Sequence, residues 1–165
     1  MNRFESCLDF VLNVEGGLSD DPADRGGRTN LGITEGTLAR ARSDGLTKAA
    51  EVDSLTKEVA AAIYRAYYWK PCRCGELPKP IDLAVFDAAV HMGTSAASRQ
   101  IQRALNLLGA EPPLAEDGIV GVRTLEAARQ LPRKWRLRAA RVTLAVRSAA
   151  LLGLASRSVS QRRFL

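Results

Sequence analysis

Hydrophobic residues recur at helical spacing along most of the chain. The first apolar stripe, between Phe4 and Leu12, predicts an amphipathic helix that Gly16 and Gly17 bring to an end. Further helices are predicted over 36–42, 55–69, 81–92, 96–108 and 124–131, and a final helix over about 134–152. Thr124 is the expected N-cap of the helix that it begins. Because strands and helices do not alternate, the expected fold class is mainly α.

Three segments rich in glycine, proline or aspartate interrupt the helical pattern. They are EGGLSDDPADRGGRTNLGIT at 15–34, KPCRCGELPKP at 70–80 and GAEPPLAEDGIVG at 109–121. The chain has 165 residues, of which 46% are hydrophobic and 25% charged, so it can bury a core and is not globally disordered. The long first segment is therefore expected to serve a function rather than to reflect general disorder.

The charge of the chain favours a polyanionic partner. The net charge is +6, and nucleic acid, a membrane surface and an anionic cell-wall polymer are all compatible with it. Aromatic residues make up only 5% and do not interleave with basic ones, so we expect no nucleic-acid partner. No apolar run reaches membrane-spanning length, and Glu5 and Asp9 interrupt the first residues, so we expect neither stable membrane insertion nor a signal peptide.

The cysteines predict no metal site. Cys7, Cys72 and Cys74 are too few for a disulfide framework, and the spacing of the last two is shorter than zinc ligands usually have. The single histidine, His91, lies far from them in the sequence. We expect small packed or exposed thiols, no metal and no cofactor.

The first interrupted segment places carboxyl groups in two environments. Glu15 follows an apolar stripe at the negative end of a helix dipole, which is expected to raise its pKa and to suit it as a general acid. Asp24 and its neighbouring aspartates lie in the following polar loop, close to Thr29 and Thr34. Paired carboxyls in different environments are typical of glycoside hydrolysis, and glycines let a backbone approach a sugar chain. Turns and helix caps without any chemistry are the alternative, whereas the order of the aspartates does not fit an EF-hand.

The stretch VEGGLSDDPADRGGRTNLGIT resembles the signature of glycoside hydrolase family 108, which comprises bacterial and phage muramidases, among them endolysins and secretion-associated enzymes. The resemblance implies that Glu15 is the catalytic acid. The Asp-x-Gly-Gly-x-Thr element of the family falls on 24–29, and its Gly-Ile-Thr element falls on 32–34.

Later parts of the chain are similar to the same family. YRAYYWKP at 64–71 and FDAAVHMGTSAASRQIQRALN at 86–106 resemble later blocks, and the second of these, together with DGIVGVRTL at 117–125, resembles its C-terminal peptidoglycan-binding region. The resemblance implies a lysozyme-like helical domain. We expect a catalytic part over 1–80 and a helical peptidoglycan-binding part over 81–165, packed as one compact unit.

The implied reaction is hydrolysis of the β-1,4 bond between N-acetylmuramic acid and N-acetylglucosamine. Glu15 would protonate the leaving oxygen, while Asp24 and Thr29, by resemblance to phage lysozymes, would orient the attacking water for inversion. A lytic transglycosylase needs only the acid, so Glu15 would serve that reaction too. A peptidoglycan-binding module without catalysis is the third alternative.

Six further residues are assigned to substrate binding: Gly16, Gly17, Thr34, Tyr68, Asp87 and His91. Tyr68 is the one aromatic residue of its cluster that we place in a cleft, because aromatic stripes usually fill cores. Asp87 is either a cleft residue or, as we favour, a paired carboxylate within the helix packing. His91 lies one helical turn beyond Asp87, so the two side chains are within hydrogen-bond reach.

Basic residues are concentrated near the end of the chain. They are Arg129, Arg133, Lys134, Arg136, Arg138, Arg141 and Arg147. We interpret most of them as a solvated helix face that attracts anionic wall polymers. The protein is expected to be made in the cytoplasm and to act on glycan strands in the periplasm or cell wall. Its release is expected to depend on a holin or a secretion partner.

Overall fold

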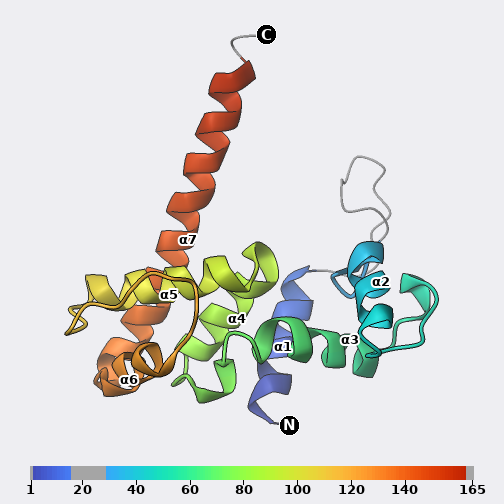
Figure 1. Ribbon diagram of the computed structural model, residues 1–165, viewed down its shortest axis with the longest axis horizontal. Helices are drawn as coiled ribbons and strands as arrows, with labels where there is room; N and C mark the ends of the chain where they lie inside the picture. Colours follow the sequence, from blue (N-terminus) through green and yellow to red (C-terminus); the bar gives the residue numbers. More distant parts are fainter. Residues whose placement is uncertain (1, 16–28, 163–165) are drawn as a thin grey trace. The chain divides into compact units, whose positions relative to one another are not determined.

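The computed structural model describes residues 2–15 and 29–162, and Figure 1 shows that helices dominate them. The chain divides into two compact units, Met1–Tyr67 and Tyr68–Leu165. The described strands form one two-stranded sheet. The predicted mainly α fold class is therefore confirmed. The expected functional boundary at residue 80 stays a prediction.

The first unit is built around a short helical core. Its elements are α1 (Arg3–Glu15), β1 (Thr29–Asn30), β2 (Ile33–Thr34), α2 (Glu35–Ser43), the 3₁₀ turn η1 (Val52–Ser54) and α3 (Lys57–Tyr64). The π-helical turn η2 (Arg65–Trp69) follows and contains the boundary between the two units. Asn2 and Glu5 form a reciprocal cap at the start of α1, because each side chain accepts from the other residue's backbone N–H. The predicted apolar stripe of α1 is buried from Phe4 to Val11.

The second unit is a bundle centred on α4. Its elements are the 3₁₀ turn η3 (Cys74–Glu76), α4 (Ile81–Met92), α5 (Thr94–Leu107), α6 (Val122–Gln130) and α7 (Arg133–Arg162). Helix α4 packs against both α5 and α7, and these two also pack against each other. The sequence predicts that α4 is buried on most sides, and its buried residues from Ile81 to Ala89 confirm this. Trp69 adds an edge-on contact to Phe86, with ring centroids 5.3 Å apart.

Three helix ends differ from the sequence-based expectation. Thr124 is not an N-cap, because α6 begins at Val122 after Gly121 and Thr124 is buried inside it, where its hydroxyl lies 3.4 Å from the Gln102 amide. The helix expected over 55–69 begins instead at Lys57, after the cap Thr56, and changes to a π-helical turn from residue 65. The last helix continues to Arg162, ten residues beyond its predicted end at 152. Gly153 does not end it, since one glycine only weakens a helix.

Candidate functional site

Glu15 is the last residue of α1 within the described residues, in agreement with its predicted place at a helix C-terminus. Its backbone therefore lies at the negative end of the helix dipole. The Glu15 side chain, Gly16, Gly17 and Asp24 lie outside the described part of the structure. Their proposed roles stay predictions.

Thr29 and Thr34 are brought together by a tight hairpin. The strands β1 and β2 pair antiparallel with Thr29 opposite Thr34. The two residues between the strands, Leu31 and Gly32, have φ values of 51° and 70°. Two consecutive positive φ angles match a type I′ turn, whose twist suits a two-residue hairpin. Leu31 is strained there by about 1 kcal/mol, because its Cβ crowds the following carbonyl in this region.

Two long-range hydrogen bonds hold the hairpin in this conformation. The hydroxyl of the fully buried Tyr64 donates to the Leu31 carbonyl at 3.0 Å, and the Asn30 side-chain amide donates to the Val52 carbonyl at 2.8 Å. Both partners come from later segments of the first unit. The hairpin is therefore fixed by tertiary contacts and not by its own turn sequence alone.

Thr34 has a structural role that its sequence context does not predict. Its hydroxyl caps α2 by accepting from the Thr37 backbone N–H at 3.2 Å, and it lies 3.1 Å from the Thr37 hydroxyl. A substrate contact by Thr34 would have to share this oxygen with the cap. In its predicted substrate role, Thr34 could therefore use only the hydrogen-bonding capacity that its hydroxyl retains after capping α2.

Asp87 and His91 lie together in the second unit with a third charged residue. Asp87 is 8% exposed, and one of its carboxylate oxygens pairs with the Arg147 guanidinium from α7. The other oxygen lies 3.5 Å from Nε2 of His91, one turn further along α4. Asp87 therefore has the geometry of a paired carboxylate within the helix packing. Arg147 is partly buried by this pairing and is an exception to the solvated basic face that the sequence predicts.

The aromatic cluster around Tyr68 is mostly occupied by packing. Tyr64 and Trp69 are buried. Tyr67 donates to the Asp44 carboxylate at 2.6 Å, and the Arg40 guanidinium lies over its ring. Tyr68 is half-buried, and its assignment to the substrate stays a prediction.

The buried thiols form a small polar cluster without a metal-binding arrangement. Cys72 and Cys74 are buried thiols, and a hydrogen bond with the Cys74 thiol lowers the pKa of Cys72 more than burial raises it. Within the described residues, no three histidine, cysteine, aspartate or glutamate side chains gather as metal ligands. No helix among the described residues combines the length and the apolar character needed to span a membrane.

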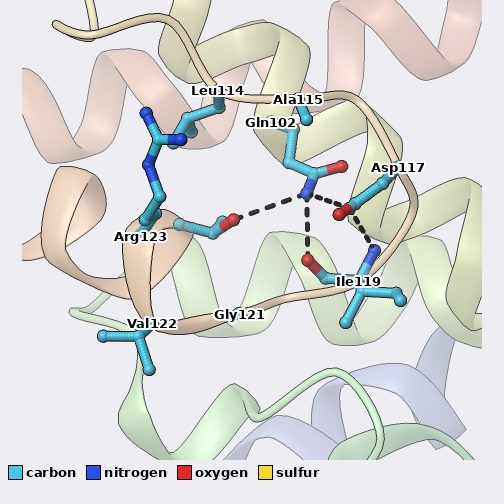
Figure 2. A pocket seen from close by; sticks show the side chains of 9 residues that line it. Gln102, Leu114, Ala115, Asp117, Ile119, Gly121, Val122 and Arg123 are labelled. Atoms are coloured by element: carbon cyan, nitrogen blue, oxygen red, sulfur yellow. Dashed lines mark hydrogen bonds between the residues drawn. The ribbon is translucent and has the colours of Figure 1, made fainter.

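A cavity in the second unit was not predicted from the sequence. It has a volume of about 310 Å³ and lies where the loop over 109–121 folds against α5 and the start of α6 (Figure 2). The buried amide of Gln102 donates to the Asp117 carboxylate at 2.7 Å and to the Ile119 carbonyl at 2.9 Å. Its oxygen accepts from the Gly118 backbone N–H at 3.0 Å. The composition of the loop was visible in the sequence, but its buried glutamine partner on α5 was not.

Comparison with known proteins covers both units. The sequence matches the family model described as glycosyl hydrolase 108 over residues 8–93. It also matches a model described as a predicted peptidoglycan domain over residues 96–165. Among solved structures it is similar to SagA of Brucella abortus, with 34% sequence identity and a TM-score of 0.77. That match covers 98% of this chain and 86% of the SagA chain. No curated protein matches the sequence.

Proposed function

Because the chain belongs to glycosyl hydrolase family 108, we propose that it cleaves the β-1,4 bond between N-acetylmuramic acid and N-acetylglucosamine in peptidoglycan, with Glu15 as the general acid. The observation that carries the proposal is the position of Glu15 as the last residue of α1, directly before the glycine-rich part of the family match. The helical, lysozyme-like fold and the peptidoglycan-domain match over 96–165 agree with a peptidoglycan substrate.

The chemistry follows from the environment of each group. The C-terminal end of a helix disfavours a negative charge, which would favour the protonated form that Glu15 needs to give a proton to the leaving oxygen. Asp24 would accept a proton from the attacking water, and Thr29 would orient that water from the hairpin. Inversion follows if the two carboxyls stand about 6.5–9.5 Å apart and leave room for the water.

The remaining proposed roles concern binding and delivery. Gly16, Gly17 and Thr34 would line the glycan cleft, and Tyr68 would stack on a sugar ring. Asp87 would contact the substrate while held by its two basic partners. The protein would be made in the cytoplasm and reach the cell wall through a holin or a secretion partner.

Digestion of purified peptidoglycan tests the central claim. Wild type, Glu15→Gln and the control Glu51→Gln would be incubated with the polymer, and the released muropeptides identified by mass spectrometry. Glu51 is an exposed residue of the same unit, so its variant matches the chemical change without touching the proposed acid. We expect reducing N-acetylmuramic acid ends from wild type and Glu51→Gln, and none from Glu15→Gln.

Two other results would support the alternatives. Anhydro-muramic ends would identify a lytic transglycosylase that uses the same acid. No release by wild type, together with sedimentation on the polymer, would indicate a binding module, which the peptidoglycan-domain match favours as the second candidate.

The water-orienting roles need a separate measurement. Asp24→Asn and Thr29→Ala are expected to lower the hydrolysis rate about 10²-fold or more, because each removes a group that positions or activates the nucleophile. Sedimentation on peptidoglycan should be unchanged in both variants. Proton NMR of the first product anomer would establish inversion or retention, and unchanged rates in both variants would exclude these roles.

A further inference from the structure

The cavity in the second unit presents two opposite charges that do not pair with each other. Figure 2 shows Arg123 on one side of the cavity and Asp117 on the opposite side. Both side chains are exposed, and no ion pair joins them. The Arg123 guanidinium makes one long contact of 3.5 Å to the Pro113 carbonyl. The cavity therefore offers a cationic and an anionic contact at separate points.

Asp117 is held as an anion with an orientation that the fold determines. Hydrogen bonds from the Gln102 amide and the Ile119 backbone N–H lower its pKa, in that order of size. Both of these bonds end on the same oxygen, Oδ1. A carboxylate has two oxygens with several acceptor positions, so Asp117 retains capacity for a donor on a ligand.

Apolar side chains lie along one edge of the cavity. Ile119 is 67% exposed and Val122 is 62% exposed, and both line it. They are two of only six large hydrophobic side chains exposed in the part of the chain that the structure describes. A ligand with a short aliphatic segment would remove them from water.

The loop that carries these groups is fixed before any ligand binds. Gly118 has a φ of 84°, and a Cβ at this position would lie 2.5 Å from the Ser95 hydroxyl and 3.1 Å from its carbonyl. The Asn106 side chain both donates to the Leu114 carbonyl and accepts from its N–H, at 3.0 and 2.8 Å. Such preorganisation lowers the entropy cost of binding.

The size and lining of the cavity select the class of ligand. A volume of about 310 Å³ is at the lower end of the range for ligand pockets, which suits one amino-acid residue better than a glycan chain. No aromatic residue lines the cavity, so it has no flat apolar surface for a sugar ring. A carboxylate and an ammonium group joined to an aliphatic chain match all three of its features.

We propose that this cavity binds the zwitterionic amino-acid end of the diamino acid in a peptidoglycan stem peptide. The free carboxylate would bind Arg123, the free ammonium group would bind Asp117, and the methylene chain would cover Ile119 and Val122. In peptidoglycan, an uncrosslinked meso-diaminopimelate residue carries such an end, whereas a lysine residue carries only the ammonium group. The proposal rests on peptidoglycan being the partner and deepens it by assigning a peptide contact separate from glycan cleavage.

Calorimetry of the full-length protein with two synthetic tripeptides tests the proposal. The peptides are L-Ala-γ-D-Glu-meso-diaminopimelate and the same peptide with L-Lys at the third position, each with the main-chain carboxyl of the third residue amidated so that this lysine has no free carboxylate. We expect the diaminopimelate peptide to bind at least about tenfold more tightly, since a charge-assisted pair to Arg123 is lost with lysine. Arg123→Gln should remove this preference, and Asp117→Asn should weaken both peptides. The control Arg103→Gln removes an exposed arginine of α5 that does not line the cavity, and should change neither.

The outcomes separate this site from the proposed catalysis. Equal binding of the two peptides by wild type, no binding, or an unchanged preference in Arg123→Gln would overturn the peptide site. Glu15-dependent hydrolysis of peptidoglycan would then still stand. If wild type and Arg123→Gln differ in peptide preference as expected while no hydrolysis is found, the peptide site stands and the catalytic proposal fails.

Discussion

Two glutamines on α5 are both buried, but their hydrogen bonding differs. Gln102 is 2% exposed and makes three bonds of 3.0 Å or less, to the Asp117 carboxylate, the Ile119 carbonyl and the Gly118 N–H. Gln100 is 5% exposed, its side-chain nitrogen donates only to the Met92 sulfur at 3.2 Å, and its oxygen has no hydrogen-bond partner among the described residues. Leucine has nearly the same volume as glutamine, so a Gln→Leu substitution at either position changes the hydrogen bonding more than the packing. The pair therefore separates the contribution of hydrogen bonds from that of burial.

Gln102→Leu is expected to lower the free energy of unfolding of the second unit by about 2 kcal/mol. Three bonds at about 1 kcal/mol each give roughly 3 kcal/mol, and water reaching the exposed loop partners after the substitution recovers part of this. Gln100→Leu is expected to be neutral or stabilising by up to about 1 kcal/mol, because it removes a buried carbonyl that lacks a partner.

Urea denaturation followed by tryptophan fluorescence measures the difference. Both tryptophans of the chain, Trp69 and Trp135, belong to the second unit, so their emission reports its unfolding. With a slope of about 2 kcal/mol/M, Gln102→Leu should lower the midpoint by about 1 M. Equal midpoints for the two variants, at an unchanged slope, would show that the amide of Gln102 does not organise the loop.

Three more substitutions test other contacts. Arg147→Leu should destabilise the second unit by about 2 kcal/mol, because it leaves the buried Asp87 carboxylate with a single partner. In the same urea assay, the exposed control Arg141→Leu should change the free energy of unfolding by no more than about 0.5 kcal/mol. Tyr64→Phe removes the hydroxyl that holds the turn, so it should lower the free energy of unfolding by about 1 kcal/mol and speed hydrogen exchange of the hairpin amides. Tyr67→Phe removes a hydroxyl that binds outside the hairpin and should leave that exchange unchanged. Asp117 has a lowered pKa in the fold, so its contribution to stability is present above the unfolded value of about 3.9 and is lost as the pH falls through the folded value. The stability difference between wild type and Asp117→Asn should therefore shrink between pH 7 and pH 3, and a constant difference would contradict this assignment.

The helices were predictable because their apolar spacing is a local property of the sequence. The end of α1 at Glu15 followed from the two glycines after it, and the burial of α4 followed from its nearly continuous apolar residues. Thr124 shows the limit of such reasoning. A threonine before an apolar stripe is a usual sequence signal for an N-cap. Only the tertiary structure shows that a glutamine 22 residues away contacts the hydroxyl of this threonine.

The less predictable parts of the candidate site depend on partners that are distant in the sequence. The Leu31–Gly32 turn lacks the Asn-Gly or Asp-Gly pair that usually marks a two-residue hairpin, and the hydroxyl that holds it comes from 33 residues downstream. The pairing of Asp87 required an arginine 60 residues further along the chain. A run of basic residues indicates a charged surface, and it does not show which member turns towards the core.

The ion pair between Asp87 and Arg147 also has a consequence for the time course of synthesis. At about 5–20 residues per second, the ribosome adds Arg147 roughly 3–12 s after Asp87, so throughout that interval α4 lacks both its charged partner and the helix that covers it. The first unit is complete in sequence well before this. The nascent second unit therefore exposes the part of α4 that α7 covers until almost the whole chain has been made.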